Sequence, residues 1–264
     1  MKTDKYAFFL DIDSTLWKWG VIPPINKETI KRVRELGHKV FINTGRSYGY
    51  IPKTLFDEVE LDGVVSGIGA SVRINGEHIE KKHISVEDIK YIFEYFAGKG
   101  IWVIFEGEER VIFYNDNKEA ECNFLPEGTD AYVLLDENEW NEKYSRELIS
   151  KITVDKFVPN EEEIAELSKR FSVISHPEEN YTEIGVLACD KGVGMLKAAE
   201  FLGIDVSHCV AMGDSPNDLA MLEAAGISVA MGDAYDVVKG MADIVSVNCM
   251  DGGVAHAMKL ILKI

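Results

Sequence analysis

The chain has 264 residues, of which 46% are hydrophobic, enough to bury the core of one large domain or of two modest ones. Its formal net charge of −17 repels polyanions, which argues against nucleic acid or an acidic membrane surface as a partner. The sequence shows no signal peptide and no apolar run of transmembrane length, and Cys122, Cys189, Cys209 and Cys249 lack a metal-binding spacing, so we expect a cytoplasmic protein with reduced thiols.

The first stretch that carries chemistry is an apolar run, residues 6–10, which leads directly into Asp11 and Asp13. An unbroken apolar run is typical of a buried parallel strand. Side chains two residues apart on an extended backbone point the same way, and ligand sites of parallel sheets lie at the carboxyl ends of the strands. We therefore expect both carboxylates to face one site. The alternative is a strand followed by an Asp-rich turn without a function.

A loop and a helix follow. The loop, residues 16–24, carries Trp17 and Trp19, which either shield the neighbouring carboxylates from water or simply pack. The helix is expected to begin after Asn26 as its N-cap and to end near Gly37.

The second predicted strand, residues 39–43, completes a β-α-β unit and ends in Thr44 and Gly45. A hydroxyl and a glycine at such a strand end can hold an oxyanion through the hydroxyl and backbone N–H groups. The same pair is more often just a turn, so this signal is weak by itself. Residues 62–66 predict a third short strand.

The pattern changes after about residue 70, where Asn75-Gly76 predicts a hairpin turn and shorter strands and helices then alternate. This α+β stretch shows no convincing catalytic constellation. We predict that residues 84–183 form an inserted second domain, and that residues 1–83 and 184–264 together form the first.

Lys191 begins the next predicted helix, at a position where the helix macrodipole disfavours a cation. A residue that breaks a local rule is a functional candidate, and a lysine here can bind a phosphoryl group or offset carboxylates. An exposed lysine at a mild cost is the alternative.

An apolar strand, residues 209–213, ends in a further carboxylate, Asp214. Helix capping explains the residues after it, because Ser215 suits the N-cap, Pro216 the first helical position and Asp218 a capping-box pair. Capping does not explain Asp214.

In a doubly wound parallel sheet, these strand ends can meet at one crevice. Three carboxylates in a small crevice repel one another unless a cation intervenes, and oxygen ligands of this kind favour Mg²⁺ over Zn²⁺. The group contains a nucleophilic carboxylate, a second carboxylate for proton transfer, a hydroxyl and an ammonium, which is the equipment for phosphoryl transfer through an aspartyl-phosphate. Its members are Asp11, Asp13, Thr44, Lys191 and Asp214.

The sequence resembles the haloacid dehalogenase superfamily, in particular its Cof-type phosphatases, which carry a large α/β cap of the C2 kind. Four motifs match in order over essentially the whole chain: Asp11-Ile12-Asp13-Ser14-Thr15-Leu16, Thr44-Gly45-Arg46, Lys191, and Gly213-Asp214-Ser215-Pro216-Asn217-Asp218. The resemblance implies an α/β fold with a doubly wound, Rossmann-like parallel-sheet core and an inserted α+β cap.

The resemblance also implies a role for each motif residue. Asp11 would be the nucleophile, and Asp13 would protonate the leaving alcohol and then activate water. The implied magnesium ligands are Asp11, the Asp13 backbone carbonyl and Asp214, with Asp218 in support, and the implied phosphate-binding residues are Thr44, Gly45, Lys191 and Asn217.

The implied substrate is a small phosphorylated metabolite, such as a sugar phosphate or a phosphorylated cofactor, and we expect a monomer or a small homo-oligomer. Three positions depart from the family pattern, which usually has glycine at Ser14, asparagine at Ile68 and serine at Asp190. These departures leave the hydrolytic residues in place but weaken any transfer of substrate choice from relatives.

Two other functions stay open at this point. A non-enzymatic phospho-acceptor, as in signalling receiver domains, also places acidic residues, a threonine and a lysine on a parallel sheet, but the added acid/base at Asp13 favours turnover. A phosphotransferase or mutase would use the same scaffold with a sugar hydroxyl in place of water.

Overall fold

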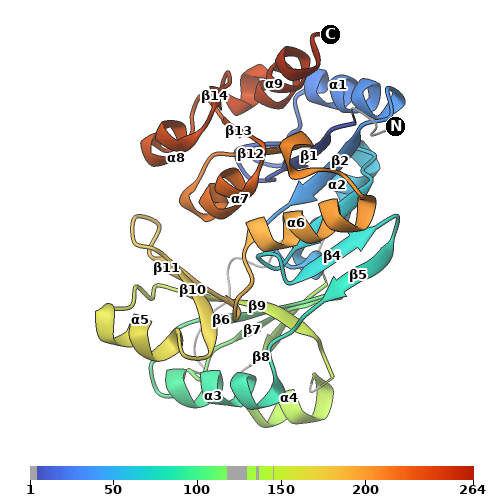
Figure 1. Ribbon diagram of the computed structural model, residues 1–264. Helices are drawn as coiled ribbons and strands as arrows, with labels where there is room; N and C mark the ends of the chain where they lie inside the picture. Colours follow the sequence, from blue (N-terminus) through green and yellow to red (C-terminus); the bar gives the residue numbers. More distant parts are fainter. Residues whose placement is uncertain (1–4, 118–129, 135–136, 145) are drawn as a thin grey trace. The chain divides into compact units, whose positions relative to one another are not determined.

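The computed structural model describes residues 5–117, 130–134, 137–144 and 146–264 (Figure 1). It divides into two compact units. The first comprises Met1–Gly45, Thr54–Lys81 and Asp190–Ile264, and the second comprises Arg46–Lys53 and Lys82–Cys189.

The first unit is built on an eight-stranded sheet in the order β14-β13-β12-β1-β2-β3-β4-β5. The strands from β14 to β3 pair in parallel, and β4 and β5 add an antiparallel hairpin at one edge. All residues of β1 and β12 are buried, as expected for a parallel sheet covered on both faces. The strands are β1 Ala7–Leu10, β2 Lys39–Asn43, β3 Gly63–Ser66, β4 Ser71–Ile74, β5 Glu77–Lys81, β12 Cys209–Gly213, β13 Ile227–Ala230 and β14 Ile244–Val245.

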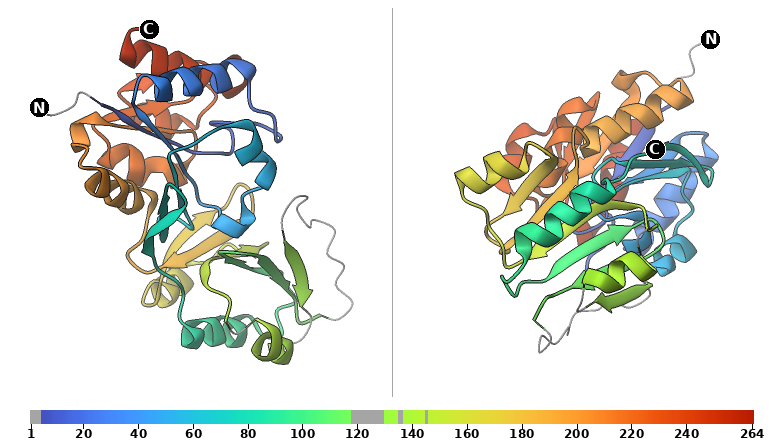
Figure 2. Two further views of the ribbon diagram at one scale, coloured as in Figure 1. Left: turned by 90° about the vertical axis from the view of Figure 1, so that its right-hand side faces the viewer. Right: turned by 90° about the horizontal axis from the view of Figure 1, so that it is seen from below.

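Helices cover both faces of this sheet, so the predicted doubly wound α/β core is confirmed (Figures 1 and 2). From the central strands β1 and β12, the chain continues to β2 on one side and to β13 on the other. Right-handed crossovers therefore place the connecting helices on opposite faces of the sheet. Accordingly α1 packs with α9, and α6 packs with α7. The helices are α1 Pro24–Glu35, α2 Lys53–Glu58, α6 Lys191–Leu202, α7 Leu219–Ala224, α8 Asp236–Met241 and α9 Gly253–Leu262.

The predicted N-cap of α1 is wrong. The helix begins at Pro24, because proline at the first position is already set for helical geometry and Pro23 precedes it in an extended conformation. Asn26 instead lies buried inside the helix, where its amide oxygen accepts a hydrogen bond of 3.0 Å from the backbone N–H of Ala255. It therefore ties α1 to α9.

The second unit contains a six-stranded sheet in the order β10-β11-β9-β6-β7-β8, mostly antiparallel, and includes the whole predicted insert, residues 84–183. Helices α3, α4 and α5 pack against one face of it through an apolar core that includes Phe93, Phe105, Trp140 and Leu167 (Figure 1). Its elements are α3 Val86–Phe96, β6 Val103–Gly107, β7 Val111–Tyr114, β8 Ala131–Leu134, α4 Glu137–Lys143, β9 Ile149–Asp155, α5 Glu161–Leu167, β10 Phe171–His176 and β11 Tyr181–Val186.

Two expectations from composition concern the cysteine thiols and the absence of a membrane-spanning segment. Cys189, Cys209 and Cys249 are buried free thiols, and Cys122 lies outside the described residues. Every helix within the described ranges is too short or too polar to cross a lipid bilayer.

Glycines allow the start of α6 to approach the sheet closely. A Cβ atom added at Gly69 would lie 1.9 Å from the backbone oxygen of Asp190, and one added at Gly194 would lie 2.8 Å from the Cα atom of Gly69. Gly69 also has a φ of +84°, which a residue with a Cβ adopts only at a cost. The position of Lys191, the first residue of α6, therefore depends on this close contact.

We predict that Gly69→Ala destabilises the protein far more than Gly76→Ala. Gly76 has nearly the same φ, +83°, but nothing lies within 4 Å of an added Cβ, so its substitution measures the backbone strain alone, about 1 kcal/mol. Gly69→Ala adds a steric clash with backbone, which we expect to cost roughly 2 kcal/mol more. Urea unfolding of both variants measures the difference, and equal losses would contradict the close-packing argument.

Candidate active site

Three neighbouring strands of the first unit bring their carboxyl ends to one edge of the sheet. β1 lies between β12 and β2 and is parallel to both, so Asp11, Asp214 and Thr44 follow adjacent strand ends. Thr44 and Gly45 are buried there, and the backbone N–H of Thr44 donates to the carbonyl of Val65 at 2.9 Å. The sequence argument placed these residues at one sheet edge for the same reason.

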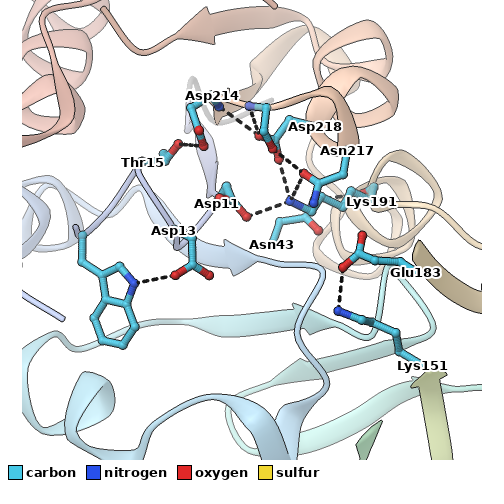
Figure 3. A network of polar contacts seen from close by, with 12 residues as sticks. Asp11, Asp13, Thr15, Asn43, Lys151, Glu183, Lys191, Asp214, Asn217 and Asp218 are labelled. Atoms are coloured by element: carbon cyan, nitrogen blue, oxygen red, sulfur yellow. Dashed lines mark hydrogen bonds and ion pairs between the residues drawn. The ribbon is translucent and has the colours of Figure 1, made fainter. Parts of the chain in front are cut away.

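The centre of the site is the fully buried ammonium group of Lys191 (Figure 3). Its Nζ atom lies 2.7 Å from Asp11 Oδ1 and 2.6 Å from Asp218 Oδ1. It also donates to Asn217 Oδ1 at 3.0 Å. Lys191 is therefore not an exposed lysine at a helix start, the alternative that the sequence left open.

Negative charge exceeds positive charge in this cluster. Asp11, Asp214 and Asp218 each place one carboxylate oxygen within 4.8 Å of the others, and Lys191 supplies one ammonium against the three carboxylates. With all three carboxylates ionised, these four described residues carry a formal charge of −2. Oxygen donors with this charge excess fit a hard divalent cation such as Mg²⁺.

The pKa shifts in the cluster have a common origin. Burial raises the pKa of Asp11 well above its usual value, and Asp218 and Asp214 raise it further against the opposing effect of Lys191. Burial also raises the pKa of Asp214 to about 7, with Asp218 as the next cause. Burial opposes the charge of Lys191 too, but its attraction to Asp11 and Asp218 prevails and keeps its pKa above the usual value. A negative electrostatic potential raises the pKa of carboxyl and ammonium groups alike, because it disfavours the loss of a proton. A bound cation would weaken that potential and lower these pKa values.

Asp218 is held by the chain itself. Its Oδ2 atom accepts hydrogen bonds from the backbone N–H groups of Asp214 at 2.9 Å and Ser215 at 3.1 Å, and its Oδ1 atom accepts from Lys191. The short 3₁₀ turn Pro216–Asp218 places it there. These contacts favour a supporting role over direct metal binding.

Two further residues of the site were missed by the sequence argument. Thr15 donates through Oγ1 to Asp214 Oδ1 at 3.2 Å, and Asn43 donates through Nδ2 to the backbone carbonyl of Lys191 at 2.9 Å. Thr15 lies inside a recognised motif, and Asn43 is a buried polar residue at the last position of an apolar strand, which is the signal that could have identified it.

The expectation that the extended strand continues through Asp13 is wrong, although the Asp13 carboxylate is still close enough to raise the pKa of both Asp11 and Asp214. β1 ends at Leu10, and the backbone then turns sharply, since the carbonyl of Ile12 accepts from the N–H groups of Leu16 and Trp17. Asp11 points to Lys191, whereas the exposed Asp13 carboxylate accepts a hydrogen bond of 3.1 Å from the indole Nε1 of Trp17 (Figure 3).

The structure gives a local account of each departure from the family pattern. Ser14 has a φ of +59° and Ile68 a φ of +55°, both in the left-handed region. Glycine and asparagine, the usual family residues, adopt this region more easily than serine or a β-branched isoleucine. Asp190 is the N-cap of α6, where its side chain accepts from the N–H of Val193 at 2.7 Å, so it performs the capping that serine would perform.

The second unit contains a charged cluster that the sequence argument did not identify. Lys151 is buried and lies 2.6 Å from Glu183 and 3.1 Å from Glu106, and His176 contacts Glu183 at 3.2 Å. Burial opposes charge on both Lys151 and Glu183, but attraction to Glu106 and Glu183 raises the pKa of Lys151, and Lys151 with His176 lowers the pKa of Glu183. Lys151 and Glu183 lie in strands that mix polar and apolar residues, so the sequence pattern did not mark them as buried.

The chain is similar to known proteins over nearly its whole length. Phosphatase YwpJ of Bacillus subtilis strain 168 is 28% identical over 96% of this chain and 98% of its own length. The 5-amino-6-(5-phospho-D-ribitylamino)uracil phosphatase YwtE of the same organism is 26% identical over 96% of this chain and 97% of its own length. Among solved structures, the HAD subclass IIB sugar phosphatase BT4131 superposes with a TM-score of 0.80 at 27% identity, covering 98% of this chain and all of that one.

The resemblance inferred from the four sequence motifs is confirmed by a match over nearly the whole chain. The model of the haloacid dehalogenase-like hydrolase family matches residues 8–258, which include every motif residue considered above. The chain therefore belongs to the haloacid dehalogenase-like hydrolases.

Proposed function

We propose that this hydrolase is a Mg²⁺-dependent phosphatase that cleaves small phosphomonoesters through an aspartyl-phosphate on Asp11. The observation that carries the proposal is the buried Lys191 ammonium between Asp11 and Asp218, in a cluster with three carboxylates against one ammonium. The phosphatase relatives and the family match support the same reaction class.

Asp11 and Asp13 divide the chemistry in this proposal. Asp11 attacks phosphorus, and its new P–O bond forms as the bond to the alcohol breaks, while Asp13 gives its proton to the departing oxygen. Water then attacks the phosphoryl group, Asp13 takes its proton, and phosphate leaves Asp11. The separate environments of the two carboxylates, one beside an ammonium and the other beside an indole, support separate roles.

The phosphoryl oxygens would be bound by Lys191, Thr44, the backbone N–H of Gly45 and Asn217. The Asn217 carbonyl oxygen accepts from Lys191 and from Ser215. The NH₂ group of the same amide is the donor that would bind a phosphate. Asp11, the Asp13 backbone carbonyl and Asp214 would hold the cation, with Asp218 and Thr15 orienting the cluster. When bound, Mg²⁺ supplies positive charge to the phosphoryl oxygens and offsets repulsion between carboxylates.

The inserted unit would act as a cap that selects the leaving group. The chain enters the second unit twice, for Arg46–Lys53 directly after Gly45 and again from Lys82, and it returns to the first unit at Asp190, next to Lys191. Two of these connections therefore follow or precede proposed phosphate-binding residues in the sequence. We assign the predicted insert, residues 84–183, to the cap and the first unit to the catalytic core. In the structure the cap unit also takes in residues 46–53, 82–83 and 184–189, which the prediction placed in the core. Sugar phosphates or phosphorylated cofactors are the proposed substrates, and the names of two relatives, a sugar phosphatase and a 5-amino-6-(5-phospho-D-ribitylamino)uracil phosphatase, support this substrate class.

We predict phosphate release from a panel of small phosphomonoesters that requires both Mg²⁺ and Asp11. Asp11→Asn removes the nucleophile and should lower kcat by at least about 10³-fold, whereas Asp57→Asn, an exposed position on α2, should behave like the native protein. Assays of the native protein and of both variants, each with Mg²⁺ and with a chelator, measure the requirement for Asp11 and the requirement for Mg²⁺.

The same panel separates the alternative functions. Transfer of the phosphoryl group to a second sugar hydroxyl in preference to water would indicate a phosphotransferase or mutase. Stable phosphorylation of Asp11 by a small phosphodonor, without turnover of any ester, would indicate a phospho-acceptor instead of a phosphatase.

We expect Lys191→Met to abolish most activity, lowering kcat/KM by about 10²-fold or more, because no other ammonium contacts Asp11 among the described contacts. The matched control is Lys197→Met, on the exposed side of the same helix α6, which should retain native activity. Similar activity of the two variants would exclude Lys191 from phosphate binding. Far-ultraviolet circular dichroism checks that both variants are folded.

Metal addition should stabilise the protein in a way that depends on Asp214. Mg²⁺ at 100 times its Kd stabilises a protein with one site by about 2.7 kcal/mol, so the unfolding temperature of the native protein should rise. Asp214→Asn removes one of the excess charges, so it should unfold at a higher temperature than the native protein in chelator, yet respond less to Mg²⁺. Thermal unfolding of both proteins tests this prediction. If Mg²⁺ stabilised Asp214→Asn as much as the native protein, Asp214 would not be a metal ligand.

A further inference from the structure

We propose that Trp17 is a positioning residue for catalysis, whose indole N–H holds the Asp13 carboxylate in the orientation required for proton transfer. This inference rests on the proposed phosphatase function. Its basis is the hydrogen bond of 3.1 Å from Trp17 Nε1 to Asp13 Oδ1, marked by the dashed line at the labelled Asp13 in Figure 3.

Asp13 itself is poorly constrained by burial. It is the exposed carboxylate of the motif, while Asp11 and Asp214 are buried. An exposed aspartate samples several rotamers, and proton transfer to a leaving group requires a defined distance and direction. A fixed donor on one oxygen limits this freedom.

Trp17 is well suited to provide that fixed donor. Its side chain is only 6% exposed, and the turn after β1 returns it to Asp13, because its backbone N–H donates to Ile12 and its carbonyl accepts from the N–H of Ser14 at 2.8 Å. A short bridge also pairs Asp13 with Trp17 along the backbone. The backbone contacts of the turn therefore hold the Trp17 indole next to Asp13.

The segment after Trp17 is anchored as well. Lys18 and Val21 form two backbone hydrogen bonds across a tight turn, whose central residues Trp19 and Gly20 have φ values of +54° and +75°. Such a turn with two positive φ values is typical of a two-residue hairpin. Lys18 pairs with Asp233 at 2.9 Å, which fixes the hairpin to the rest of the unit.

The chemistry of an indole suits this role. The N–H group is a donor only, and Oδ1 can accept from it whether the carboxyl group is ionised or protonated. The indole can therefore stay bonded to Oδ1 while the carboxyl group gives its proton to the ester oxygen in the first step and receives the proton of water in the second. Trp17 thus orients Asp13 without exchanging a proton itself.

The test compares Trp17→Phe with Trp19→Phe. Phenylalanine keeps an aromatic ring but removes the N–H donor, and Trp19, 87% exposed in the same loop, provides the matched control. The assay measures kcat/KM for an alkyl phosphate, whose leaving oxygen needs a proton, and for 4-nitrophenyl phosphate, whose leaving oxygen does not. We expect Trp17→Phe to lower kcat/KM roughly tenfold for the alkyl ester and less than about twofold for the nitrophenyl ester, with Trp19→Phe unchanged for both.

A double-mutant comparison separates positioning from general damage. In an Asp13→Ala background, Trp17→Phe should cause no further loss with the alkyl ester, because the group that it positions is absent. Equal losses with both esters, a further loss in the Asp13→Ala background, or native behaviour of Trp17→Phe would each overturn the inference while leaving the phosphatase proposal intact. Absence of turnover by the native protein would overturn both.

The hydrogen bond itself can be observed without turnover. The chain contains four tryptophans, so the indole N–H region of a ¹H–¹⁵N spectrum is simple, and loss of one signal in Trp17→Phe assigns Trp17. We expect that signal to move upfield in Asp13→Ala more than the other three do. An unmoved Trp17 signal would contradict the contact on which the inference is based.

Discussion

The arrangement of the first unit depends on one constraint, a lysine ammonium that is fully buried at the start of a helix. Burial and the macrodipole both oppose a positive charge at Lys191, and only several nearby oxygen atoms can offset them. Asp11, Asn217 and Asp218 provide those atoms from two different strand ends. Three carboxylates around one ammonium leave a formal excess of negative charge, and in the proposed function that excess is what a cation would balance.

The fold supplies this arrangement through features with little chemistry of their own. Parallel pairing of β12, β1 and β2 aligns three strand ends, and glycines at 69 and 194 let α6 approach them closely enough for Lys191 to reach Asp11. Asn43 then holds the first turn of α6 through the Lys191 carbonyl. A steric change at Gly69 is consequently expected to affect both stability and the site, although Gly69 has no side chain to contribute to catalysis.

Much of the core fold and of the candidate site was predictable from sequence, because both follow from local sequence patterns. Apolar runs that end in Asp11 and Asp214 predict parallel strand ends, and the four ordered motifs predict the family. The turn after β1 was not predictable from spacing, since the reversal at Ser14 requires a left-handed serine, and it gives Asp11 and Asp13 different partners. The start of α1 at Pro24 was missed although a local feature, the fixed φ of proline, sets it. The buried Lys151–Glu183 pair was missed because it depends on the pairing of β9 with β11.

The separation of Asp11 from Asp13 gives each carboxylate the partner that its proposed task requires. A nucleophile must stay ionised, and the Lys191 ammonium favours the ionised form of Asp11 against the effects of burial and neighbouring acids. An acid/base group must gain and lose a proton in every cycle, so it benefits from a donor that can stay bound in both states. The neutral indole of Trp17 orients Asp13 in either state. The sharp turn after β1, which ends the extended strand before Asp13, is what makes these two environments possible within three residues.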